Sequence, residues 1–178
     1  ILEEAKKAAY VLVCESARAD GSLVNRRKGS ATFGLHFHGI ASHAGNDPEK
    51  GRSAVVEMAH WILELGKHND YANGTSLTIG LVKGGSASNV VPEYAEATLD
   101  LRFWDNNKFD EIKALLDKLA AKPFVDGVKV EVRVQAKKPA MVMNAGTEKL
   151  MHFVEAAGKK IGLPITWQAV GGGSDANV

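Results

Sequence analysis

Four stretches in the middle of the chain alternate between apolar and polar positions, which is the pattern of half-buried strands. They cover residues 32–38, 75–82, 95–103 and 128–134. In the third stretch, Leu99, Leu101 and Phe103 fall on one face and Arg102 falls on the other. We therefore expect a sheet whose two faces differ in polarity.

Two stretches between these strands repeat apolar residues at the spacing of an amphipathic helix. The first covers residues 53–67, and Asp47 is expected to cap its start, with Pro48 at the first helical position. The second begins at Asn106 or Asn107. The resulting order is β-α-β-β-α-β, that of a ferredoxin-like domain with an antiparallel sheet and two helices on one face.

The flanks of this domain predict elements of a parallel α/β type. Residues 8–14 form a continuous apolar run, which fits a strand buried on both faces, and residues 17–29 are interpreted as a connection. Beyond a linker at residues 137–139, a helix capped by Thr147 and a last strand at residues 165–170 are predicted.

These elements predict an α+β chain with an insertion. A ferredoxin-like domain at residues 31–137 interrupts an α/β domain, of which residues 1–30 and 138–178 are two pieces. We interpret both ends as truncated, because Ile1 is not an initiator methionine and the chain stops within a glycine-rich turn. A signal peptide could precede this sequence, so the compartment stays open, with the cytoplasm favoured over the periplasm or secretion.

Composition excludes several classes of protein. The 178 residues contain 45% hydrophobic residues, 22 Lys and Arg, and 21 Asp and Glu. The longest basic run is Arg26-Arg27-Lys28, so neither a nucleic-acid surface nor a surface for anionic membranes is expected. A single cysteine, Cys14, excludes an internal disulfide, and we expect a buried inert thiol rather than a catalytic one.

His43 is the strongest candidate for chemistry in the inserted domain. It lies in Ala41-Ser42-His43-Ala44-Gly45, where the neighbouring side chains are too small to bury an imidazole. The expected turn leaves the ring exposed and free to orient, although an ordinary loop histidine is the alternative. His36 and His38 share one strand face, and we favour solvated or interface histidines there over a metal site.

Four further positions have a functional and a structural interpretation. Glu15 follows the apolar run, where a carboxylate can bind a metal or transfer a proton, or simply end a strand. Asn89 ends a small-residue loop and can both donate and accept hydrogen bonds, although the loop can be a plain hairpin connection. Arg102 can clamp a substrate carboxylate or pair with a neighbouring acid. The triple glycine at residues 171–173 can line a site with backbone N–H groups or form a flexible tail.

Together these residues resemble a family of di-zinc metallopeptidases that includes glutamate carboxypeptidase, acetylornithine deacetylase, succinyl-diaminopimelate desuccinylase and aminoacylase. The matching segments are residues 10–15, 39–45, 84–92, 99–102 and 171–175, in this order. The resemblance covers essentially the whole chain and points to the glutamate carboxypeptidase branch.

The resemblance implies a role for each matching residue. Glu15 matches a zinc ligand of the catalytic domain. His43 matches a histidine that the inserted domain extends into the active site of the other subunit, where it would donate a hydrogen bond to the oxyanion. Asn89 and Arg102 match substrate-binding residues, with Arg102 facing the terminal carboxylate.

The resemblance also implies a dimer and a larger enzyme. Gly172 and Gly173 match a catalytic-domain loop beside the substrate, and the choice between them stays open. The insertion matches the family's dimerisation or lid domain, which implies a homodimer. The family's His-x-Asp motif, bridging Asp, Glu-Glu pair and last histidine ligand would all lie outside this chain.

The function implied is therefore that of a fragment. The full-length protein would be a zinc-dependent hydrolase, with two zinc ions, that cleaves an amide bond next to a free carboxylate in a small peptide or N-acyl amino acid. This chain alone would bind no zinc and be inactive. The alternative is a non-catalytic module that self-associates or senses a small ligand. Carboxypeptidase and deacylase activities are not distinguished.

Overall fold

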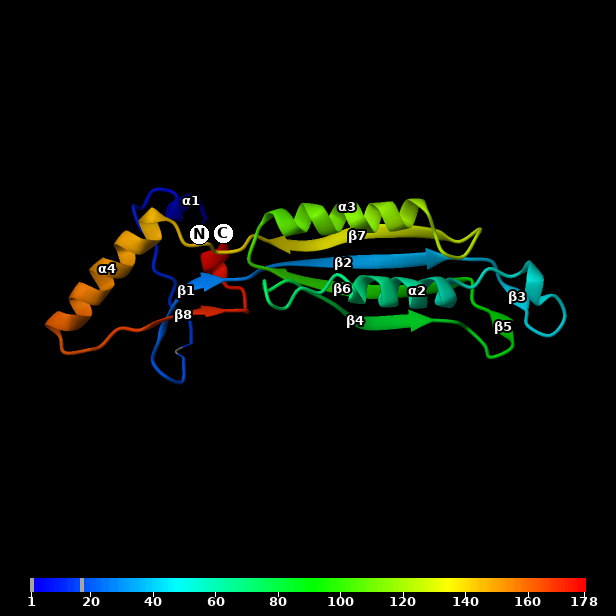
Figure 1. Ribbon diagram of the computed structural model, residues 1–178, viewed down its shortest axis with the longest axis horizontal. Helices are drawn as coiled ribbons and strands as arrows, with labels where there is room; N and C mark the ends of the chain where they lie inside the picture. Colours follow the sequence, from blue (N-terminus) through cyan, green and yellow to red (C-terminus); the bar gives the residue numbers. More distant parts are fainter. Residues whose placement is uncertain (1, 17) are drawn as a thin grey trace. The chain divides into compact units, whose positions relative to one another are not determined.

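The computed structural model describes residues 2–16 and 18–178 (Figure 1). The chain forms two compact units. Unit 1 combines Ile1–Gly29 with Lys138–Val178, and unit 2 is the continuous segment Ser30–Lys137. The elements are helices and strands in mixed order, so the predicted α+β class is confirmed.

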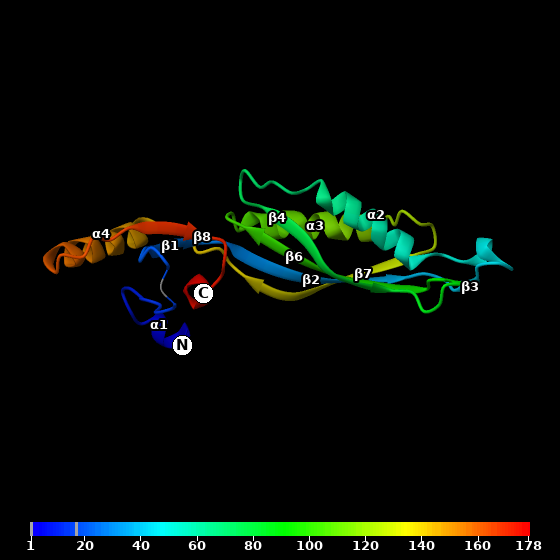
Figure 2. The same cartoon turned by 90° about the horizontal axis from the view of Figure 1, so that it is seen from below.

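Unit 2 is a four-stranded sheet covered by two helices. Its strands are Gly29–His38 (β2), Ser76–Gly84 (β4), Tyr94–Phe103 (β6) and Lys129–Lys138 (β7), and its helices are Ala54–Gly66 (α2) and Asn107–Ala121 (α3). The strand order in the sheet is β4-β6-β2-β7, and β4 pairs antiparallel to β6. Both helices lie on the same face of the sheet (Figure 2). This is the predicted β-α-β-β-α-β arrangement.

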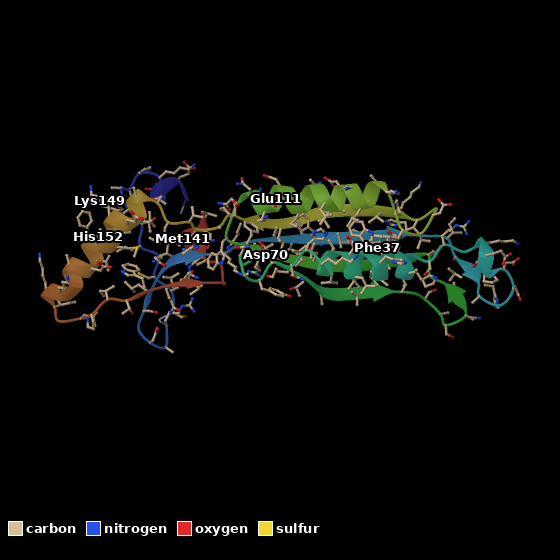
Figure 3. All side chains as sticks on the ribbon, in the orientation of Figure 1. Phe37, Asp70, Glu111, Met141, Lys149 and His152 are labelled. Atoms are coloured by element: carbon tan, nitrogen blue, oxygen red, sulfur yellow. The ribbon has the colours of Figure 1, made fainter. Side chains whose placement is uncertain are left out.

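The core of unit 2 lies between the sheet and the helices. Alternate residues of the two central strands are buried, namely Ala31, Phe33, Leu35, Phe37, Ala95, Ala97, Leu99, Leu101 and Phe103. Phe37, labelled in Figure 3, packs edge-on against Trp61 of α2 with ring centroids 5.5 Å apart. The period-2 pattern thus identified the buried face of the sheet, because successive side chains of a strand point to opposite faces.

Helix α2 begins later than the sequence predicted. Asp47 precedes a separate 3-10 turn, Pro48–Lys50 (η1), and makes no side-chain capping bond. Gly51 then has an extended backbone, with φ −76° and ψ 156°, so the turn cannot continue into a helix. The actual cap is Ser53, whose hydroxyl accepts a hydrogen bond from the backbone N–H of Val56 at 3.2 Å.

Unit 1 contains two strands that pair in parallel. Its elements are Leu2–Ala5 (α1), Leu23–Arg27 (β1), Ala145–Lys160 (α4), Trp167–Val170 (β8) and the 3-10 turn Asp175–Asn177 (η2). Leu23 lies opposite Trp167 and Arg27 opposite Val170. β1 was missed because its polar sequence, interpreted as a connection, has no apolar period. Asn144 rather than Thr147 caps α4, since its side chain accepts from the Thr147 N–H.

The apolar run at residues 8–14 is not a strand, so this prediction was wrong. The segment has irregular backbone, and Leu12 is 69% exposed. Cys14 is also exposed, which contradicts the expected buried thiol. A strand buried on both faces needs neighbouring strands and covering layers on both sides. Within the described residues, the parallel sheet of unit 1 consists of β1 and β8 alone.

Within residues 2–16 and 18–178, no helix has both the length and the apolar composition needed to cross a membrane.

One carboxylate is enclosed in the apolar core of unit 2. Glu57 of α2 is fully buried. Its Oε1 accepts a hydrogen bond from Trp61 Nε1 at 2.8 Å, and its Oε2 accepts one from the backbone N–H of Val125 at 2.7 Å. The side chain therefore ties α2 to the turn that precedes β7.

Replacing Glu57→Ala should lower the free energy of unfolding by about 3 kcal/mol, because two donors would lose their acceptor. Urea unfolding of the chain measures this. Glu64→Ala on the same helix is the matched control, since the Glu64 carboxylate pairs with Lys67 at the surface. Equal unfolding midpoints for the two variants would show that the buried hydrogen bonds contribute little.

Candidate functional site

His43 lies on a short pair of strands outside the main sheet of unit 2. Ser42–His43 (β3) pairs antiparallel with Val90–Val91 (β5), with His43 opposite Val90. The backbone N–H of Ala44 donates to the carbonyl oxygen of Asn89 at 2.9 Å. Two residues predicted from the sequence, His43 and Asn89, are therefore neighbours, and both are exposed. We name residues 40–53 and 85–92 the tip.

Two glycines allow backbone segments to approach closely at and beside the tip. Ile40 and Arg52 exchange two backbone hydrogen bonds of 2.9 Å, and a Cβ on Gly39 would collide with the carbonyl oxygen of Arg52. A Cβ on Gly51 would lie 2.7 Å from Val91 Cγ1 and would also meet Ser42 Oγ. The absence of side chains at Gly39 and Gly51 thus lets these backbone segments approach.

The ring of His43 is held by the turn that follows it. Its Nδ1 accepts hydrogen bonds from the backbone N–H groups of Gly45 at 3.1 Å and Asn46 at 3.2 Å. The predicted exposed turn histidine is thus observed, but its ring is fixed rather than free to orient.

Arg102 lies at the other end of the sheet from the tip. On β6, Ala95 pairs with Gly84 beside the tip, whereas Arg102 pairs with Ser76. Arg102 lies seven residue positions along the extended strand from Ala95, which is roughly 23 Å. Unit 2 therefore does not bring Arg102 to His43.

Arg102 has a carboxylate partner on its own strand. Its Nε and one terminal nitrogen donate to the two oxygens of Asp100 at 2.6 and 2.9 Å. These bonds raise the pKa of the Arg102 guanidinium above its usual value, so the group stays charged. The pairing with a neighbouring acid that the sequence left open is thus present. The pair is half exposed, so a substrate carboxylate could still approach the guanidinium.

The two strand histidines lie beside Tyr94, whose ring centroid is 5.4 Å from that of His38, and His36 joins a polar network there. His36 Nδ1 lies 3.0 Å from the Tyr94 hydroxyl, which donates to Glu96 at 2.8 Å. This bond to Glu96 raises the pKa of Tyr94. No three His, Cys, Asp or Glu side chains gather as a metal site in the part of the chain that the structure describes.

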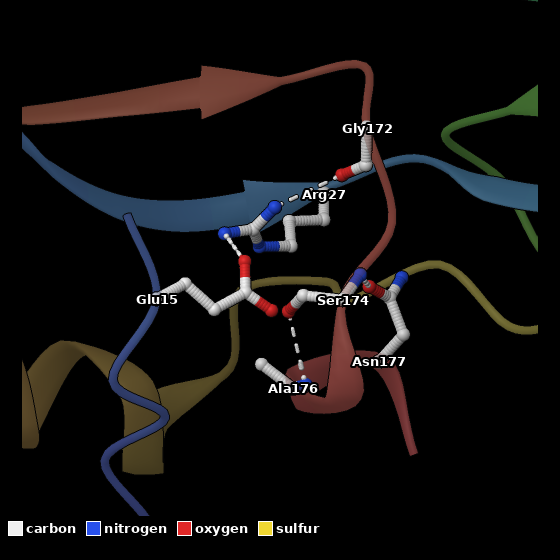
Figure 4. A network of polar contacts seen from close by, with 6 residues as sticks. All are labelled: Glu15, Arg27, Gly172, Ser174, Ala176 and Asn177. Atoms are coloured by element: carbon white, nitrogen blue, oxygen red, sulfur yellow. Dashed lines mark hydrogen bonds and ion pairs between the residues drawn. The ribbon is translucent and has the colours of Figure 1, made fainter. Parts of the chain in front are cut away.

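Of the remaining predicted residues, Glu15 and Gly172 are joined through Arg27 in unit 1 (Figure 4). The Arg27 guanidinium donates to Glu15 Oε2 at 3.1 Å and to the carbonyl oxygen of Gly172 at 3.1 Å. The Arg27 side chain is 9% exposed, whereas that of Glu15 is 38% exposed. Arg27 thus joins Glu15 to the glycine loop. Nothing in the sequence pointed to this role, because Arg27 belongs to the basic run at residues 26–28, which is typical of a solvated surface.

The glycine loop is anchored beyond Gly173. Ser174 and Asn177 form a capping box around the last 3-10 turn. The Asn177 amide also donates to the carbonyl oxygens of Lys28 and Pro139 at 3.1 and 2.8 Å. The loop is therefore tied to unit 1 on both sides, by Arg27 and by Asn177, and the flexible-tail interpretation does not apply.

A cavity of about 460 Å³ opens beside this network within unit 1. Glu15, Arg27 and Ser174 form part of its polar lining. The rest is mainly apolar and comes from residues 11–14, β1, α4 and Trp167. A mostly apolar hollow with a few polar groups is typical of a binding cleft or of an incomplete core.

Comparison with protein families identifies the chain. Residues 25–128 match the M20 family model described as a peptidase dimerisation domain. The chain belongs to the M20 peptidase family. The resemblance found in the sequence is thus confirmed at the level of the family, and the matched residues cover most of unit 2.

Individual M20 relatives are longer than this chain. It is 33% identical over 181 residues to carboxypeptidase G2 of Pseudomonas sp. (strain RS-16), which covers 99% of the chain and 43% of the relative. It is 31% identical to succinyl-diaminopimelate desuccinylase of Psychrobacter arcticus, covering 96% and 44%. The crystal structure of aminopeptidase PepT from Bacillus cereus superimposes with a TM-score of 0.74 and 28% identity, covering 92% and 43%. The chain spans less than half the length of these relatives.

Replacing Gly51→Ala should displace the tip, because the new Cβ would overlap Ser42 and Val91. We expect the amide NMR signals of Ser42, His43 and Val90 to shift. Overpacking of this kind should cost about 1–3 kcal/mol of stability.

Gly66→Ala is the matched control for this substitution, because a Cβ there meets nothing within 4 Å. It should leave the tip signals unchanged. Equal shifts in both variants would contradict the close-approach explanation.

Proposed function

We propose that this chain is part of a zinc-dependent hydrolase that cleaves an amide bond next to a free carboxylate, with unit 2 pairing with a second copy and supplying His43 to that copy's active site. Membership of a peptidase family supports hydrolysis. The names of two relatives, a carboxypeptidase and a desuccinylase, support an amide substrate that carries a carboxylate.

The separation of the polar groups along unit 2 is the observation that carries this proposal. His43 and Asn89 belong to the tip, while Arg102 lies roughly 23 Å away along β6. A small substrate cannot reach both ends of one copy. Two copies in opposite orientation would bring the tip of one toward the Arg102 end of the other.

The exposed edge β4 is the surface that we propose for this pairing. The edge strands of the sheet are β4 and β7. β4 exposes apolar Leu81 (69%) and Val82 (58%), and neighbouring α2 exposes Leu63 (71%). β7 instead exposes charged side chains such as Lys129 and Glu131, which discourage edge pairing.

Two-fold symmetry gives this pairing a direction. Two copies of the same edge strand related by a two-fold axis across the edge run antiparallel. β4 runs from Ser76, opposite Arg102, to Gly84 beside the tip. The tip of one copy would then lie along the Arg102 end of its partner.

Each side chain then has a defined role in the proposed site. The His43 ring N–H would donate to the oxygen that becomes negative as the amide carbonyl is attacked. The Arg102 guanidinium would bind the substrate carboxylate, and the Asn89 amide would hydrogen-bond the substrate. Gly172 and Gly173 would contribute a loop beside the substrate.

Zinc requires residues beyond this chain. Glu15 can supply one carboxylate ligand, but it is hydrogen-bonded to Arg27, and the described residues contain no group of three or more His, Cys, Asp or Glu that could hold a metal ion. The residues present therefore do not by themselves fit a zinc site. In the full-length protein, zinc would activate the attacking water, and Glu15 would be one ligand among several.

Replacing His43→Ala in the full-length protein should lower kcat about 100-fold and change KM little, because the lost hydrogen bond forms mainly in the transition state. Steady-state kinetics on an N-acyl glutamate measures both constants. His68→Ala is the control, as His68 is a half-exposed histidine of unit 2 outside the proposed site. A kcat within a few-fold of the unmodified enzyme would rule out the oxyanion role.

Sharing of the site between subunits can be tested by mixing two inactive variants. If His43 acts on the partner, a 1:1 mixture of His43→Ala and Glu15→Ala subunits should recover about a quarter of the activity. Half of the dimers would be mixed, and each would contain one intact site. No recovery after confirmed subunit exchange would mean that the site lies within one subunit.

A further inference from the structure

The turn after His43 determines which ring nitrogen carries the proton. A neutral imidazole has one N–H donor and one acceptor nitrogen. The backbone N–H groups of Gly45 and Asn46 both donate to Nδ1, at 3.1 and 3.2 Å. A backbone N–H cannot accept a hydrogen bond, so Nδ1 must be unprotonated and the proton of the neutral ring must lie on Nε2.

We propose that the backbone N–H groups of Gly45 and Asn46 select the Nε2–H tautomer of His43. They thereby determine that Nε2–H is the hydrogen-bond donor of the proposed site before any substrate binds. If Nδ1 carried the proton, it would face two other donors. The Gly45 N–H would lose its acceptor, and the Asn46 N–H would keep only its 3.3 Å hydrogen bond to the His43 carbonyl oxygen. The catalytic consequence rests on the proposed function, whereas the tautomer is a property of unit 2 itself.

The local sequence builds this turn around the ring. The N–H of Asp47 donates to the His43 carbonyl oxygen at 3.1 Å, which closes the turn. A Cβ on Gly45 would lie 3.4 Å from the ring carbon Cε1, so the ring lies directly over this backbone. Ala44 and Gly45 are small enough to leave that space to the imidazole.

The second ring nitrogen of His43, Nε2, is available to bind a ligand. Nε2 lies on the side of the ring away from the two backbone donors, and His43 is exposed. The pairing of β3 with β5 and the close backbone approaches at Gly39 and Gly51 hold the backbone beneath the ring. Gly45 and Asn46 are thus positioning residues: they act through His43 and need not touch the substrate.

The tautomer can be measured directly on the 178-residue chain. Long-range ¹H–¹⁵N NMR at a pH where the ring is neutral should show Nδ1 in the unprotonated range and Nε2 in the protonated range. The His43 signals are assigned by their loss in His43→Gln. An Nδ1–H pattern, or an equal mixture of the two tautomers, would overturn the proposal without any variant of the turn.

A matched pair of substitutions tests the role of the turn. Asn46→Pro removes one backbone donor, whereas Asn46→Ala keeps it. The Nε2–H population should fall in Asn46→Pro only, in a chain whose other amide signals remain dispersed. An equal population in both variants would show that the turn does not select the tautomer.

Kinetics of the full-length enzyme separates this inference from the proposed function. The kcat of Asn46→Pro should be about tenfold below that of Asn46→Ala, with similar KM. If the Nε2–H tautomer is found but His43→Ala retains kcat, the proposed function is wrong and the tautomer assignment stands. If His43→Ala loses kcat but the ring is the Nδ1–H tautomer, only the present inference is wrong.

Discussion

Burial of one face of the central sheet strands beneath two helices is the constraint on which the rest of unit 2 depends. The alternate side chains of β2 and β6 are almost completely excluded from water, with Phe37 packed against Trp61. Burial of this kind stabilises the domain and fixes the register of β6. Because the strand is extended and rigid, it also sets the separation between the tip and Arg102. The proposed division of one site between two copies follows from that separation.

The tip depends on backbone geometry rather than on hydrophobic burial. Its strands are two residues long, and its segments are joined by backbone hydrogen bonds such as those between Ile40 and Arg52, with close backbone approaches at Gly39 and Gly51. His43 is oriented by two further backbone donors. A functional group held in this way can be exposed and still have a defined orientation, which is what a hydrogen-bond donor to a short-lived oxyanion requires.

Unit 1 leaves apolar surface uncovered, as an incomplete hydrophobic core does. Its two-stranded parallel sheet has an apolar cavity at its side, and residues 10–13 expose Tyr, Val and Leu side chains. Glu15 is paired with Arg27, so its carboxylate is compensated within this chain. The chain spans less than half the length of its M20 relatives. We therefore propose that residues beyond this sequence supply the layers and metal ligands that the proposed enzyme needs.

The sequence by itself determined the M20 family, the α+β class, the order of strands and helices in unit 2 and the buried face of its sheet. These features follow from local periodicity. Leu99, Leu101 and Phe103, for example, occupy alternate positions of β6 and are all buried. His43 and Asn89 could be singled out because small residues surround them. The tertiary structure decided the rest, because the rest depends on which groups the folded backbone brings together. The run at residues 8–14 lacked neighbours to make it a strand, Arg27 found Glu15 across a turn, and Asn46 reached the His43 ring. Such contacts leave no period in the sequence, since they depend on where the backbone turns and which donors it brings together.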